Sequence, residues 1–108
     1  MEWFRLAQRS LGKGLPETGY QYSKATIYRA VAHDVTLIND MDYVTMSLGF
    51  AKGHADHQAA VEDESYHVLR ARVPANTVFE AYNPGEFFYH GPSVQGQVVY
   101  QAKTEEQS

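Results

Sequence analysis

The sequence predicts a single α+β domain, and three observations lead to this prediction. A chain of 108 residues has room for one hydrophobic core. Its composition, with 44% hydrophobic and 20% charged residues, is typical of a folded globular protein. A segment with helical features near residues 48–60 lies among several short segments with the period-two alternation of strands. We therefore treat residues 1–108 as one domain.

The N-terminal segment, residues 1–25, is predicted to be a helix followed by an irregular arm. Apolar side chains recur at roughly helical spacing between Trp3 and Leu11, and two glycines then end the segment. The first predicted strand is Thr26 to Ala32, which is rich in β-branched and aromatic residues. Its alternation places Arg29 on the same face as two apolar neighbours, Ile27 and Val31.

The middle of the chain predicts a short strand followed by a helix. Tyr43 to Met46 is the strand, and Ser47 is a suitable N-cap for a helix that continues to about Ala60. A longer strand follows from Tyr66 to Val73, with the residues His67, Leu69, Ala71 and Val73 on one face and Arg70 and Arg72 on the other.

The C-terminal third predicts three more strands. Thr77 to Ala81 is a short strand, and the turn Asn83-Pro84-Gly85 leads into a second strand from Glu86 to His90. Val94 to Ala102 is the last strand, with Val94, Val98 and Tyr100 on one face. Residues 103–108 are a polar tail.

Charge and composition exclude several classes of function. A formal net charge of -4 argues against broad nucleic-acid binding, although a single local phosphate contact stays open. The absence of cysteine excludes disulfides and thiolate metal sites, and it suits a reducing cytoplasm. No apolar stretch is long enough to cross a membrane. We expect a cytoplasmic protein, and a phage-encoded or delivered protein would act in the host cytoplasm.

A metal site is one interpretation of the helix, and a solvated helix end is the other. His54, Asp56 and His57 include a pair that is three residues apart on one helix face. Because no further ligand is evident, we expect no metal site.

Several short motifs, taken in order, resemble those of small bacterial and phage ADP-ribosyltransferase-like domains. The series covers about residues 26–91 and runs from Ile27-Tyr28-Arg29 through Thr45-Met46-Ser47 to Gly85-Glu86-Phe87. The resemblance implies a compact split β-sandwich, in which two facing antiparallel sheets, with one or two short helices, bind NAD as a co-substrate.

The resemblance also implies roles for six residues. Glu86, Arg29 and Ser47 would be catalytic, with Glu86 holding a hydroxyl of the nicotinamide ribose as the glycosidic bond opens. The residues that would bind NAD are Arg29, Tyr28, Thr45, Ser47 and Phe50. Four of them have a simpler interpretation: Arg29 as a surface residue, Ser47 as a helix cap, Phe50 as core and Glu86 as a solvated residue that follows a turn.

The resemblance implies transfer of ADP-ribose to a macromolecular acceptor, most simply a protein, with release of nicotinamide, in a phage or toxin setting. Arginine-modifying enzymes of this type carry Glu or Gln two positions before the catalytic glutamate, whereas this chain has Pro84. The resemblance therefore does not extend to arginine as the acceptor. The alternative is a catalytically inactive binding or inhibitor module that contacts a protein partner through its many aromatic side chains.

Overall fold

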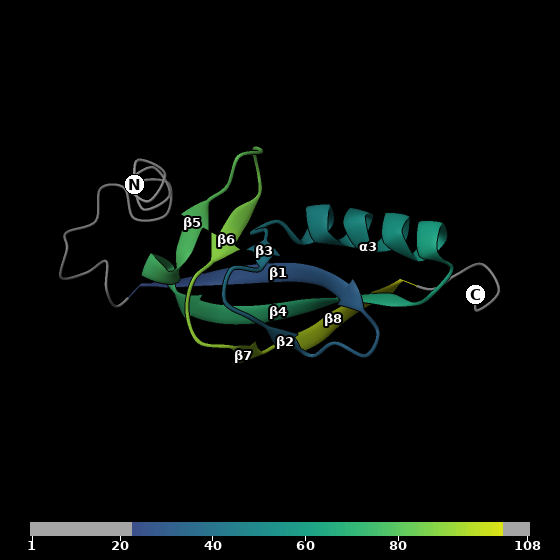
Figure 1. Ribbon diagram of the computed structural model, residues 1–108, viewed down its shortest axis with the longest axis horizontal. Coiled ribbons are helices and arrows are strands. Elements are labelled where there is room, and N and C mark those ends of the chain that lie inside the picture. The colour runs from purple at the N-terminus through teal and green to yellow at the C-terminus, as the bar shows by residue number, and fades with distance from the viewer. Residues whose placement is uncertain (1–22, 103–108) are drawn as a thin grey trace.

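The computed structural model describes residues 23–102, which form an α+β domain with three antiparallel sheets and one α-helix (Figure 1). The largest sheet has the order β1-β4-β8. Its strands are β1 (Lys24–Ala32), β4 (Tyr66–Pro74) and β8 (Gln97–Ala102). The second sheet has the order β3-β6-β5, with β3 (Tyr43–Val44), β6 (Phe87–Tyr89) and β5 (Val78–Glu80). The third pairs β2 (Leu37–Ile38) with β7 (Val94–Gln95).

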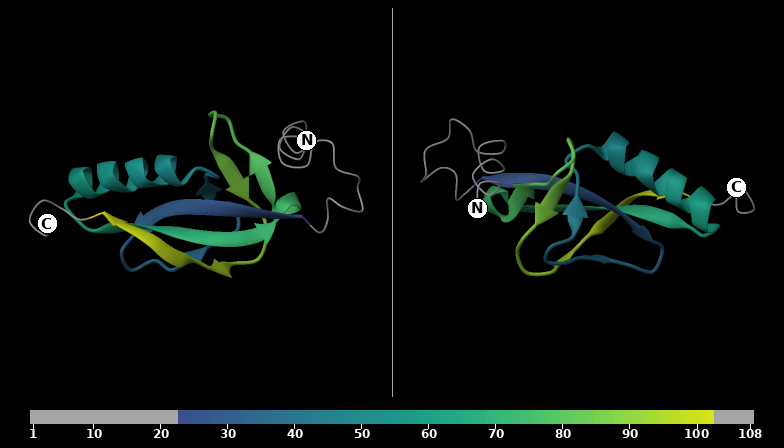
Figure 2. Two further views of the ribbon diagram at one scale, coloured as in Figure 1. Left: turned by 180° about the vertical axis from the view of Figure 1, so that it is seen from behind. Right: turned by 45° about the horizontal axis from the view of Figure 1, so that its top comes forward.

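The α-helix, α3 (Leu48–Glu62), covers one end of the largest sheet. Figure 2 shows from two further sides that α3 lies toward one end of the long strands β1 and β4, and that the β5 and β6 strands lie toward the other end. A short 3-10 helix, η1 (Ala75–Thr77), links β4 to β5. No helix within residues 23–102 is long and apolar enough to cross a membrane.

Two clusters of buried side chains cover the two faces of β4. The larger cluster joins the largest sheet to the other two sheets, and it includes Ile27, Leu69, Val44 and Tyr89. The smaller cluster lies under α3, whose small buried side chains, those of Ala51, Ala55 and Ala59, pack close to Val68. Because alternate residues of a strand face opposite sides, burial of both Val68 and Leu69 means that β4 is covered on both faces.

The structure confirms the α+β class and the predicted helix, and it corrects several boundaries. The β-strand β1 begins at Lys24, so residues 24 and 25 belong to the sheet and not to the irregular arm. The interpretation of residues 1–22 and 103–108 lies outside the described residues. The predicted strand from Thr77 is also wrong at its start, because residues 75–77 form η1 before β5 begins at Val78.

The number of sheets also differs from the expectation of two. The predicted strand from Val94 to Ala102 is divided at Gly96 into β7, which pairs with β2, and β8, which pairs with β4. A Cβ atom added to Gly96 would lie 2.7 Å from the Cβ of Leu69, so the chain passes too close to the core there for any side chain. The expected common face of Val98 and Tyr100 is lost as well, because the register shifts between Val68 and Leu69.

Candidate functional site

A bridge between two sheets brings the candidate residues together. The backbone of Tyr28 in β1 exchanges two hydrogen bonds with Thr45, just after β3, at 2.8 and 2.9 Å. In the second sheet Val44 pairs with Phe87. When this antiparallel register is extended by one residue, Glu86 is opposite Thr45. The tyrosine, the threonine and the glutamate therefore meet although they are far apart in sequence.

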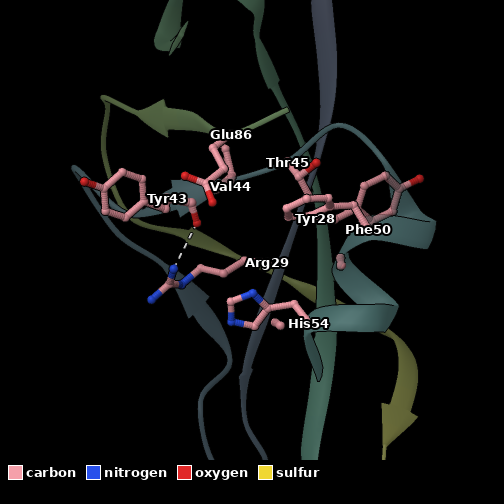
Figure 3. A pocket seen from close by; sticks show the side chains of 10 residues that line it. Tyr28, Arg29, Tyr43, Val44, Thr45, Phe50, His54 and Glu86 are labelled. Carbon is pink, nitrogen blue, oxygen red and sulfur yellow. Dashed lines mark hydrogen bonds between the residues drawn. The ribbon is translucent and has the colours of Figure 1, made fainter. Parts of the chain in front are cut away.

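A small pocket of about 80 Å³ lies at this junction. Its lining includes five of the six residues that the sequence analysis selected, namely Tyr28, Arg29, Thr45, Phe50 and Glu86. They come from β1, the end of β3, the first turn of α3 and the turn before β6. Figure 3 shows these side chains around the β3 segment.

Arg29 is held in the pocket wall by two contacts. Its Nη1 donates a hydrogen bond to the backbone carbonyl oxygen of Tyr43 at 2.9 Å, and its Nε lies 3.4 Å from a carboxylate oxygen of Asp42. The side chain remains 31% exposed. A guanidinium has five N–H donors, so most of them are still available to an anionic ligand.

Glu86 owes its position to a tight turn. The backbone N–H of Glu86 bonds to the carbonyl oxygen of Asn83 at 3.1 Å, and Gly85 has a φ of 83°. Pro84 followed by a glycine at positive φ is the signature of a type II turn. The side chain of Asn83 also donates to the Glu86 carboxylate at 3.1 Å, so the turn fixes the carboxylate as well as the backbone.

The hydroxyls of Thr45 and Ser47 are engaged in local structure. Thr45 is buried, and its Oγ1 accepts a hydrogen bond from the backbone N–H of Ser47 at 3.1 Å. The Oγ of Ser47 accepts from the backbone N–H of Phe50 at 3.1 Å and caps α3, and Ser47 is not among the residues that line the pocket. The expected strand to Met46 was wrong, because β3 ends at Val44, so the two hydroxyls are not neighbours on one strand face.

His54 lines the same pocket, although the sequence did not indicate it as a site residue. It lies beside Arg29 (Figure 3), and the two residues also line a second cavity. His54 follows Phe50 by four residues on α3, so the two side chains share a helix face. This spacing could have identified His54 from the sequence once Phe50 was chosen.

The metal interpretation finds no support among residues 23–102, where no three His, Asp or Glu side chains gather. Asp56 accepts a hydrogen bond of 2.6 Å from the hydroxyl of Tyr100, whereas His54 lines the pocket.

Two tyrosines have raised pKa values because of hydrogen bonds to carboxylates. The hydrogen bond to Asp56 raises the pKa of Tyr100. A hydrogen bond to Glu62, together with burial, likewise raises the pKa of Tyr66 to about 12. Neither tyrosine lines the pocket.

Comparison of the chain with models of protein families, with curated protein sequences and with solved structures finds no match.

Proposed function

We propose that the pocket binds the nicotinamide end of NAD and that the protein transfers ADP-ribose to a macromolecular acceptor with release of nicotinamide. The observation that carries this proposal is the meeting of Arg29, Thr45, Phe50 and Glu86 at one pocket. The proposal includes a split β-sandwich of the ADP-ribosyltransferase type, in which the β1-β4-β8 and β3-β6-β5 sheets form the two halves. The acceptor is a protein in the bacterial or host cytoplasm.

The size of the pocket limits what it holds. A volume of about 80 Å³ is well below the roughly 300 to 1,000 Å³ of a site that encloses a whole drug-sized ligand. Only one end of the dinucleotide enters, and the diphosphate lies outside, where the exposed donors of Arg29 bind it.

The chemistry follows from the position of Glu86. The bond between the nicotinamide nitrogen and C1 of the ribose breaks, and its electron pair leaves with nicotinamide. Positive charge develops on the ribose, and the Glu86 carboxylate stabilises it while accepting a hydrogen bond from a ribose hydroxyl. The acceptor nucleophile then forms a bond to C1 and loses its proton.

Replacement of Glu86 by glutamine tests the catalytic part of the proposal. Glu86→Gln keeps the shape and removes the charge, so NAD affinity should stay nearly unchanged while nicotinamide release falls about a hundredfold to a thousandfold. Release from NAD is measured with purified protein, alone and with lysate that supplies acceptors. Glu64→Gln, in the loop after α3, is the matched control. Equal turnover in Glu86→Gln and wild type removes this residue from the mechanism.

Replacement of Arg29 by lysine tests the binding part. Arg29→Lys keeps the charge but cannot make a two-pronged contact, so NAD affinity should fall roughly tenfold to a hundredfold. Calorimetry measures the affinity, and the melting temperature is recorded beside it because Arg29 also contacts Asp42 and Tyr43. Unchanged affinity makes Arg29 an ordinary surface residue.

The alternative function is a catalytically inactive module that contacts a protein partner. Exposed aromatic side chains favour it: Tyr43 and Phe50 line the pocket and are exposed, and Tyr82 in the turn before Glu86 is 95% exposed. Aromatic residues are enriched at protein interfaces. Absence of both NAD binding and nicotinamide release in the wild-type protein would support this second function.

A further inference from the structure

A further hollow is lined by residues of β1, β4, β7 and the start of β8, and it has no part in the proposed function. We name it the arginine groove. Its volume is about 690 Å³, and its lining includes Tyr28, Arg70, Arg72, Gln95 and Gln97. Tyr28 also lines the pocket described above, so the two hollows adjoin.

The arginine groove carries a local positive charge on a chain whose net charge is -4. Arg70 and Arg72 are two residues apart on the central strand β4, so their side chains leave the same face about 7 Å apart. Both are exposed, and in the part of the chain from 23 to 102 neither forms an ion pair. Arg70 donates one hydrogen bond, at 2.7 Å, to the side-chain oxygen of Gln97, which leaves its other donors available.

Flat uncharged groups flank the two guanidinium groups. Tyr28 is opposite Arg70 on β1, Gln97 is opposite Arg70 on β8, and Gln95 is nearby at the end of β7. An aromatic ring stacks on any nucleobase, and a glutamine amide can donate to and accept from base edges. An acidic side chain would pair with an arginine but would offer no flat ring to stack on Tyr28.

The position of the groove also argues against an added strand. Arg70 and Arg72 project from the face of β4, and at Arg70 this strand pairs with β1 on one side and with β8 on the other. A peptide that extends a sheet binds at the edge of the sheet and forms backbone hydrogen bonds there. A ligand that lies across a face instead needs side-chain contacts, and phosphates with stacked bases provide them.

We propose that the arginine groove binds a short segment of single-stranded nucleic acid, with neighbouring phosphates on Arg70 and Arg72 and a base stacked on Tyr28. The contact is local, which agrees with the net negative charge of the whole chain. This inference goes beyond the proposed function and needs neither NAD nor turnover.

Fluorescence anisotropy with a short labelled oligothymidylate, and with oligouridylate as a second arm, tests the proposal without NAD. Two phosphate contacts predict a slope of about -1.4 for log affinity against log salt concentration. Arg72→Gln should reduce the size of this slope by about 0.7, whereas Lys52→Gln on α3, which removes one charge elsewhere, should not change it. Tyr28→Leu should weaken binding roughly 5- to 150-fold.

Three results would overturn the proposal. The first is no binding by wild-type protein at low salt, a measurement that needs no variant to fold. The second is equal affinity for the same sequence as a duplex, because paired bases cannot stack on Tyr28. The third is a competition result in which a glutamate peptide displaces the labelled oligonucleotide at a lower concentration than the unlabelled oligonucleotide does. This result would show that the groove binds acidic protein segments. Tighter binding to one of the two oligonucleotides would support the proposal and would identify the natural ligand as DNA or RNA.

Discussion

Two substitutions of Ser47 distinguish its role as the N-cap of α3 from a catalytic role of its hydroxyl. The Ser47 Oγ accepts a hydrogen bond of 3.1 Å from the Phe50 backbone N–H at the start of α3. Loss of a serine cap costs about 1 kcal/mol, with a range of roughly 0.5 to 2. Since the first buried residue of the helix, Ala51, follows one position after Phe50, fraying of this turn loosens the packing on the sheet.

We expect Ser47→Ala to lower the free energy of unfolding by about 1 kcal/mol, which corresponds to a drop of about 4 to 8 °C in melting temperature for a domain of this size. Ser47→Asp should restore the stability, because aspartate is an equally good cap and its charge favours the helix N-terminus. Urea unfolding measures the free energy of unfolding, and calorimetry measures the melting temperature. Nicotinamide release is then compared for both variants.

Unfolding of Ser47→Ala at the same urea concentration as wild type would show that the cap contributes nothing to stability and would refute this prediction. A different result, a stable Ser47→Asp protein that has lost nicotinamide release, would return the hydroxyl to the catalytic role that the sequence suggested. Wild-type turnover in Ser47→Asp would identify Ser47 as a cap alone.

Two further predictions concern the framework around the site. Gly96→Ala should destabilise the protein by about 1 to 3 kcal/mol, because the new methyl group meets Leu69. Gly53→Ala, inside α3 with open space around it, should stabilise the protein by about 0.5 to 1 kcal/mol. Urea unfolding of both variants measures the two changes, and destabilisation of equal size in both would contradict the prediction. The raised pKa of Tyr66 means that its hydrogen bond to Glu62 stabilises the folded state below the unfolded pKa of about 10 and that this contribution is lost as the pH rises through about 12. The stability difference between wild type and Tyr66→Phe should therefore shrink over this alkaline range, and a difference that stays constant would show that the hydrogen bond does not control the titration.

Local patterns in the sequence were sufficient for the elements whose stability is local. The alternation of Tyr66 to Val73 predicted β4 and its exposed arginines, because side chains of a strand leave alternate faces. Ser47 predicted the start of α3, and Asn83-Pro84-Gly85 predicted the turn before Glu86. Each of these signals depends on backbone geometry within a few residues, so one segment of sequence contains all of it.

The composition of the site depended on contacts that no single segment encodes. The sequence suggested that Arg29, Thr45 and Glu86 act together, but their meeting depends on the bridge between Tyr28 and Thr45 and on the register of β3 against β6. Register is set by how the buried faces of separate strands pack, and a shift of one residue would turn Glu86 away from Thr45.

The sequence by itself determined the α+β class, the helix cap, the turn before Glu86 and the faces of β1 and β4, because these follow from periodicity and from hydrogen bonds between near neighbours. Only the tertiary structure decided the rest. It divided the last predicted strand at Gly96, assigned the Arg29 side chain to Asp42 and Tyr43, and placed His54 in the pocket. These outcomes depend on close approach between residues distant in sequence, and the free energy of such contacts is set by packing that exists only once the sheets and the helix have come together.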